Sequence, residues 1–118
     1  MALTNWMRRM LVPRHYAYLL RCGDGSYYAG YTVDPARRLQ AHRDGGASRY
    51  TRGRSPFRLV AVWQCPTRSV ALRLERMLKH LPHAAKRLLA SGSSIPSVTA
   101  RVRGLRARRQ PLGRGMLR

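Results

Sequence analysis

Acidic residues are scarce in this sequence. Its 118 residues include four Asp or Glu against 24 Lys or Arg, which gives a net charge of +20, and 22 of the 24 basic residues are arginine. This balance disfavours a basic partner and favours a polyanion. Because a guanidinium grips phosphate with two parallel hydrogen bonds, the arginine excess favours nucleic acid over a general acidic partner. A structural protein of the ribosomal kind has the same composition, so charge indicates the partner class and not an activity.

Cysteines and long hydrophobic runs are also few. Cys22 and Cys65 fit no metal-ligand spacing, so no zinc site is indicated. We find no secretion signal and expect reduced thiols in a cytoplasmic protein. Arginines interrupt the short apolar run at the start of the chain, which is too brief for a membrane span. The length allows one domain with a modest core, and we expect a monomer without a membrane partner.

Two tyrosine-rich segments with a glycine turn between them predict a β-hairpin. Apolar residues alternate over residues 16–20, stop at Gly23-Asp24-Gly25, and return over residues 27–32. The loop length decides which side chains share a face. The simplest alternative is that the tyrosines are ordinary strand residues with good β-propensity.

The hairpin register determines how Tyr18 and Tyr28 lie relative to each other. A three-residue loop places Tyr18 opposite Gly30, with Tyr28 diagonal to it on the same face, whereas a two-residue loop places the tyrosines on opposite faces. We expect the three-residue loop, because Gly30 then leaves room across from the Tyr18 ring where a ligand could approach.

A helix is predicted to follow this hairpin. Asp34-Pro35 combines an acidic N-cap with proline at the first helical position, so residues 36–43 should be helical. Arg38 and His42 then project from one face, one turn apart. The simpler alternatives are an ion pair between Arg38 and Asp34 and a solvated position for His42 at the helix end.

Residues 43–58 form a predicted loop with no apolar period. The loop is rich in arginine around one aromatic residue, and its candidate substrate contacts are Arg49, Tyr50, Arg52 and Arg54. Basic side chains around an exposed ring can hold phosphates while a base stacks on the ring, an arrangement suited to single strands. A solvated basic loop is the alternative.

The rest of the chain predicts one strand, two helices and a tail. Residues 57–63 should be a strand covered on both sides, with Phe57, Leu59, Ala61 and Trp63 on one face and Val60 and Val62 on the other. Helical spacing and breakers predict helices over residues 67–80 and 83–90. Residues 91–118 have seven arginines, no acid and no sustained period, so we expect a flexible basic tail that adds non-specific affinity for nucleic acid.

Glu75 is the only glutamate in the protein. It lies between Ala71 and Leu78 at the border of the apolar stripe of its helix, so its carboxylate should point toward the body of the protein. An ion pair with Lys79, four residues on, is the alternative. A chain that has shed nearly every carboxylate yet retains one at a core edge suggests a carboxylate that holds a cation.

The combination of Tyr16-Ala17-Tyr18, Tyr28-Ala29-Gly30, and Arg38 with His42 resembles the GIY-YIG nuclease module, in particular its small stand-alone bacterial branch. Tyr16 and Ala17 replace the glycine and isoleucine of the name-giving motif, and Ala29 replaces its second isoleucine. These are backbone and packing positions, while both tyrosines and Gly30 remain.

This resemblance implies an α+β fold, a three-stranded antiparallel sheet flanked by helices in the order β-β-α-β-α-α, which agrees with the elements read from the sequence. We expect an N-terminal extension over residues 1–13, a nuclease domain over residues 14–90 and the tail over residues 91–118.

It also implies a metal-dependent endonuclease that hydrolyses DNA, with single-stranded or structured DNA favoured. Glu75 would hold Mg²⁺ or Mn²⁺, Tyr18 would act as general base near Arg38, and Tyr28 would orient the water or share its proton. His42 would either orient Tyr28 or be the base itself. Substrate contacts are expected from Gly30, Arg49, Tyr50, Arg52 and Arg54. The alternative is a basic nucleic-acid-binding protein without catalysis.

Overall fold

The computed structural model describes residue 4 and residues 14–112. The predicted N-terminal extension over residues 1–13 therefore lies outside the described residues, apart from residue 4. The elements in chain order are β1 (His15–Arg21), β2 (Tyr27–Thr32), α2 (Pro35–Arg43), β3 (Arg58–Cys65), α3 (Arg68–His80), α4 (His83–Ala90), α5 (Pro96–Gly104) and β4 (Arg108–Arg109). None of the described helices is long and apolar enough to cross a membrane.

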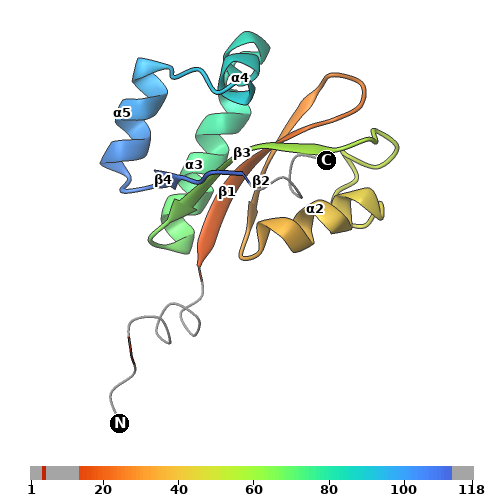
Figure 1. The fold of residues 1–118 in the computed structure, drawn as a ribbon, viewed down its shortest axis with the longest axis horizontal. Helices are drawn as coiled ribbons and strands as arrows, with labels where there is room; N and C mark the ends of the chain where they lie inside the picture. Colours follow the sequence, from red (N-terminus) through yellow and green to blue (C-terminus); the bar gives the residue numbers. More distant parts are fainter. Residues whose placement is uncertain (1–3, 5–13, 113–118) are drawn as a thin grey trace.

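The strands form one antiparallel sheet in the order β2-β1-β3-β4 (Figure 1). This α+β architecture and the element order through α4 confirm the predicted fold class. The sheet has a fourth, two-residue strand beyond the predicted three. Strand β2 is one edge of the sheet, a position that matters for the candidate site.

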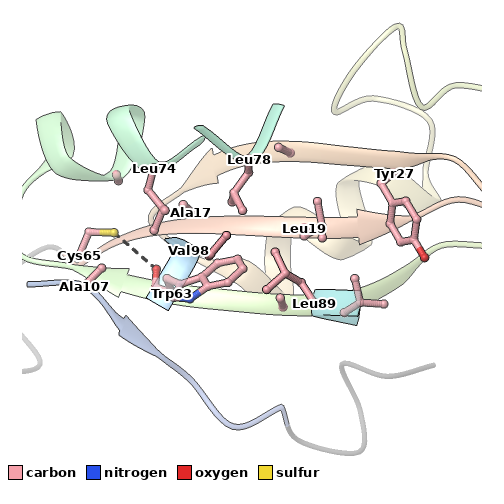
Figure 2. Close-up of a cluster of buried hydrophobic side chains, with 14 residues drawn as sticks. Ala17, Leu19, Tyr27, Trp63, Cys65, Leu74, Leu78, Leu89, Val98 and Ala107 are labelled. Carbon is pink, nitrogen blue, oxygen red and sulfur yellow. Dashed lines mark hydrogen bonds between the residues drawn. The ribbon is translucent and has the colours of Figure 1, made fainter. Parts of the chain in front are cut away.

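Two separate apolar clusters cover the two faces of the sheet. On one face α3, α4 and α5 pack against the strands, and Figure 2 shows Leu74 and Leu78 of α3 reaching toward Ala17 of β1, with Trp63 and Val98 in the same cluster. On the opposite face α2 contributes Leu39 to a smaller cluster that contains Tyr18, Leu20 and Leu59. Helix α3 is thus separated by the sheet from the face that carries the Tyr18 ring.

The hairpin has the predicted three-residue loop. The Cys22 amide donates to the Ser26 carbonyl over 2.8 Å, and Gly25 has a φ of +84°, which a side chain would disfavour. Tyr18 pairs with Gly30. Both members of the predicted tyrosine pair therefore lie on one face, and their ring centroids are 6.2 Å apart.

Strand β3 is covered on both faces as predicted, but the predicted division of its side chains is wrong. The pairing with β1 skips a residue, because Leu19 pairs with Ala61 and Leu20 with Leu59. Val60 is the extra residue of this β-bulge, which reverses the alternation beyond it. Leu59 therefore faces the α2 side, whereas Ala61 and Trp63 face α3.

The predicted flexible tail is wrong for residues 91–112, which form α5 and β4. Val98 and Ala107 are buried in the α3 side of the core. The Arg109 guanidinium donates to the Leu89 carbonyl over 2.7 Å and lies 5.5 Å from the centre of the Trp63 ring. The composition of this segment predicted disorder because it is rich in arginine. A few short apolar side chains, such as Val98 and Ala107, are nevertheless enough to anchor the segment to the core.

Candidate active site

The Tyr18 phenol lies directly against the backbone of Gly30. A Cβ atom at position 30 would collide with the Tyr18 ring and hydroxyl, so the ring requires glycine there. The space that Gly30 leaves is thus filled by Tyr18 itself, and the expected room for a ligand across from the ring is absent. Gly30 positions the phenol, and its expected role as a substrate contact stays a prediction.

His42 is buried at the end of α2 and hydrogen-bonds to Tyr18. Its residue is 1% exposed, which rules out the solvated helix end. The Tyr18 hydroxyl and His42 Nε2 are 2.7 Å apart, while His42 meets Tyr28 only through its ring, at 5.2 Å between centroids. His42 therefore orients Tyr18 rather than Tyr28.

A threonine from the basic loop determines the tautomer of His42. His42 Nδ1 lies 2.8 Å from Thr51 Oγ1, and the Thr51 hydroxyl donates its one hydrogen to the Ser48 carbonyl over 3.3 Å. Thr51 must therefore accept a hydrogen bond from His42 Nδ1–H. The lone pair of Nε2 is then free to accept the Tyr18 hydroxyl proton. Tyr18, His42 and Thr51 therefore form a continuous chain of buried hydrogen bonds.

Burial keeps both ionisable members of this path neutral near pH 7. Burial, with a smaller effect of the nearby Arg38 charge, lowers the pKa of His42 from 6.5 to about 4. Burial also raises the pKa of Tyr18 well above its ordinary value, and Tyr28 and Glu75 act in the same direction while Arg38 opposes them. Near neutrality Tyr18 is therefore a phenol that donates to an uncharged imidazole.

Arg38 stands half-buried on the same helix as His42. The predicted alternative, an ion pair with Asp34, does not form in the described chain, because the Asp34 carboxylate caps the helix by accepting the Arg37 amide over 3.1 Å. Burial has the largest effect on the pKa of both Tyr18 and His42, and the nearby Arg38 charge lowers both pKa values. Arg38 thus supplies positive charge to the phenol.

Tyr28 and Tyr50 continue the aromatic group toward solvent. The Tyr28 ring stacks with that of Tyr50 at 5.8 Å between centroids and an interplanar angle of 29°. Tyr50 is 46% exposed. Because Tyr28 lies between the buried Tyr18 and the exposed Tyr50, this side of the site ends in a partly exposed aromatic ring.

The basic loop is held in place more firmly than its composition predicts. Besides Thr51, Arg54 ties it down: its guanidinium binds Asp24 of the hairpin turn at 2.6 Å and lies 4.5 Å from the centre of the Tyr50 ring. Arg52 Nε donates to the Gly45 carbonyl over 3.3 Å. Arg49 is exposed. Of the expected substrate contacts, Tyr50 is therefore next to the phenols, Arg54 lies on Tyr50, and Arg49 and Arg52 lie on the same loop.

Glu75 projects from the flank of α3 that lies along the edge strand β2. Arg68, two helical turns before Glu75 on the same flank, lies 5.8 Å from the centre of the Tyr31 ring of β2. The Glu75 side chain is only 17% exposed and binds Lys79 Nζ at 3.0 Å, so the predicted orientation and the alternative ion pair both occur.

The helix that carries Glu75 covers the face opposite to the phenols. The negative charge of the Glu75 carboxylate nevertheless contributes to the raised pKa of Tyr18. Gly30 belongs to β2, which is the edge strand. The Tyr18 hydroxyl lies against Gly30, so it reaches from β1 toward this edge of the sheet. The carboxylate and the phenol therefore approach the same edge from opposite faces. In residues 14–112, no group of three or more His, Cys, Asp or Glu could hold a metal ion.

Sequence reasoning missed Thr51, which is buried and determines the tautomer of His42. No signal pointed to it, because a threonine between Tyr50 and Arg52 in an arginine-rich loop has the appearance of a solvated residue. Asp24 was interpreted as a turn residue. It fills that role toward Ser26 and also anchors the basic loop through Arg54.

Comparison with known proteins agrees with the sequence resemblance. The model of the family described as GIY-YIG catalytic domain matches residues 14–87. A UPF0213 protein of Halalkalibacterium halodurans is 51% identical over 77 residues, 65% of this chain and 82% of the relative. A UPF0213 protein of Xanthomonas axonopodis pv. citri is 50% identical over 76 residues, 64% of this chain and 74% of the relative. The solution NMR structure of the UPF0213 protein BH0048 from Bacillus halodurans is 46% identical, with a TM-score of 0.44, and the match covers 74% of this chain and 93% of that one. Since the family match covers more than half of the sequence, this chain belongs to the GIY-YIG family.

Proposed function

We propose that this protein is a metal-dependent endonuclease that hydrolyses phosphodiester bonds of DNA, with single-stranded or structured DNA favoured. The observation that carries the proposal is the buried chain of contacts from Tyr18 to His42 and from His42 to Thr51. With Thr51 donating to the Ser48 carbonyl, we infer that Tyr18 donates to His42 and His42 to Thr51. Phenylalanine and leucine would fill the same buried space, so packing alone does not explain a buried phenol hydrogen-bonded to a neutral imidazole. It is suited to accepting a proton from a reacting water.

The chain's own residues account for the proton transfer. The attacking water gives its proton to the Tyr18 oxygen as the Tyr18 hydroxyl proton passes to His42 Nε2, 2.7 Å away. The hydroxide forms the new P–O bond, and the bond to the 3′ oxygen breaks. The leaving 3′ oxygen takes a proton from solvent water to become a hydroxyl group, and His42 returns its proton to solvent through Tyr18. In this proposal His42 is the final base and Tyr18 is the group that touches the water.

Substrate binding improves His42 as a base. Its pKa of about 4 is low for a general base, mainly because the imidazole is buried and to a smaller extent because of the nearby Arg38 charge. A phosphodiester bound to Arg38 neutralises that charge, so the pKa of His42 rises when substrate is present. The same guanidinium then stabilises the negative charge that develops on the phosphoryl oxygens. Tyr28, adjacent to Tyr18, orients the water.

The donor set fits a hydrated divalent cation. Glu75 is a single carboxylate with a mostly buried side chain, and Mg²⁺ or Mn²⁺ bound by one carboxylate retains waters and accepts substrate phosphate oxygens as further ligands. When bound, the ion would neutralise charge on the leaving 3′ oxygen. Lys79 pairs with the Glu75 carboxylate in the absence of the ion. Because the Lys79 side chain is 53% exposed, it can turn into solvent and leave the carboxylate free for the ion.

The preference for unpaired DNA rests on Tyr50. The Tyr50 ring is 46% exposed, lies next to the proposed reaction site and shares its loop with Arg49, Arg52 and Arg54. The Arg54 guanidinium lies 4.5 Å from the ring centre, so an unpaired base would stack on the ring in place of that guanidinium. A base within a duplex has both of its faces covered by its neighbours. The same loop arginines supply phosphate contacts.

Labelled single-stranded, duplex and branched DNA test this function directly, each incubated with the protein and Mg²⁺ or Mn²⁺ and then with EDTA. We expect cleavage of the single-stranded and branched DNA that EDTA abolishes. Binding of every substrate without cleavage under any condition would contradict the proposal and support a passive nucleic-acid-binding protein, in which Glu75 serves only its ion pair with Lys79.

A further inference from the structure

Helix α3 has an outer surface that takes no part in the core or in the candidate active site. Its inner residues Ala71, Leu74 and Leu78 are buried against the sheet. Arg73 and Arg76 are exposed on the other side of the helix. This outer surface therefore presents positive charge to solvent.

Two shallow hollows on this surface meet at Arg73. The first, of about 400 Å³, is lined by Arg68, Ser69, Leu72, Arg73 and Arg76. The second, of about 550 Å³, is lined by Arg73 of α3 and, from α5 and its C-cap, by Ser97, Ala100, Arg101, Gly104 and Leu105. No carboxylate lines either hollow. Together they form a continuous basic surface, here called the α3–α5 strip, with Arg68, Arg73, Arg76 and Arg101 as its charged residues.

The charges of the strip lack counter-charges within the described chain. The two ion pairs of residues 14–112 are Arg54 with Asp24 and Lys79 with Glu75, so none involves the strip. From residue 76 to the end the sequence has 11 Lys or Arg and no Asp or Glu. Neighbouring arginines without a carboxylate are neutralised by small anions from solution. A polyanion displaces these ions when it binds, and their release favours binding.

The strip begins at the β2 edge of the sheet, where the Tyr18 hydroxyl lies against Gly30. Arg68 shares the flank of α3 with Glu75 and contacts Tyr31 of the edge strand β2. From there Arg76 and Arg73 follow around the helix, and Arg101 continues onto α5. A polyanion that leaves the site at this edge therefore meets a path of arginines over α3.

We propose that the α3–α5 strip is a second nucleic-acid-binding surface, which holds the phosphate backbone of a strand whose other part lies in the candidate active site. The inference rests on the proposed function for the identity of that strand. Helix α5 lies beyond residues 14–87, the part that matches the family. The C-terminal segment therefore extends the nuclease domain with a holding surface on the face away from the phenols.

A double substitution tests the strip against a matched control. Arg73→Gln with Arg101→Gln removes two strip charges, and Arg87→Gln with Arg103→Gln removes two exposed charges that line neither hollow. Binding of a labelled single strand of about 40 nucleotides is followed by fluorescence anisotropy in EDTA, so that no cleavage occurs, across a range of salt concentrations.

We expect the strip variant to lose about 1.4 from the slope of log affinity against log salt, from about 0.7 for each lost phosphate contact, and to bind about 20-fold more weakly at 0.1 M salt. The control should retain most of the wild-type slope. Equal losses in the two variants would overturn the strip, since only net charge would then matter. Loss of binding to anionic phosphatidylserine vesicles with DNA binding intact would overturn it in favour of a membrane surface. Because binding is measured without cleavage, the result is independent of whether the protein is a nuclease.

Discussion

The burial of neutral His42 predicts an acid-sensitive stability that can be measured without any substrate. In the unfolded chain a histidine takes up its proton near pH 6.5, whereas in the folded protein His42 does so near pH 4. Between these values the unfolded state binds more protons, so the free energy of unfolding rises with pH over this window and is lost as pH falls through it. The difference in pKa corresponds to about 3 kcal/mol.

The variant His42→Gln isolates this contribution, because its amide oxygen can still accept the Tyr18 hydroxyl but does not titrate. Urea unfolding of both proteins at a series of pH values from about 4 to 8 gives two curves, whose difference cancels every other titrating group and the repulsion within a +20 chain. We expect the stability advantage of the wild type to grow by about 3 kcal/mol from the acid end to neutrality and then to level off. Parallel curves would refute the assignment of a buried, neutral imidazole.

Three further substitutions test individual contacts. Gly30→Ala should force the Tyr18 ring aside, which should lower the free energy of unfolding by about 1–3 kcal/mol and lower kcat more than affinity. Thr51→Val keeps the shape but leaves His42 Nδ1–H without a partner, so a stability loss of about 1–3 kcal/mol should accompany a fall in kcat, and unchanged kcat would contradict its positioning role. Tyr50→Ala should weaken binding of single-stranded DNA roughly tenfold, with Tyr50→Phe close to wild type and duplex binding little changed; an equal loss for both forms of DNA would contradict base stacking.

The sequence predicted the elements that depend on local chemistry. Gly23-Asp24-Gly25 determined the loop and therefore the register that puts Tyr18 opposite Gly30. Asp34 caps its helix, as a short polar side chain before a helical run does. These features need only neighbouring residues, so the sequence is sufficient to predict them.

What the sequence could not predict depends on contacts between distant segments. The bulge at Val60 arises from the pairing of β3 with β1 and leaves no mark in the apolar pattern of residues 57–63. Helix α5 is ordered because Val98 fits against the α3 side of the core, although its own sequence has weak helical periodicity. Composition alone is a poor guide where one buried side chain outweighs several solvated arginines.

The candidate site divides along the same line. Its tyrosines, Arg38 and Glu75 could be named because their combination resembles the GIY-YIG module. The direction of the hydrogen bonds could not, because it depends on Thr51, nine residues after His42 in a loop without secondary structure. The position of Glu75 could not be predicted from the sequence either. Its helix covers the face opposite to the phenols, and its carboxylate contributes to the raised pKa of Tyr18 at the edge of β2.

The most direct test of the account compares the wild type with Glu75→Gln, a variant that keeps the shape of the side chain and removes its charge. Cleavage of single-stranded DNA in Mg²⁺ and affinity for the same DNA in EDTA are measured for both proteins. We expect cleavage by the variant to fall by at least about a hundredfold, the loss typical of removing one group that stabilises developing charge, with affinity within about twofold. Undiminished cleavage by Glu75→Gln would contradict the proposed site.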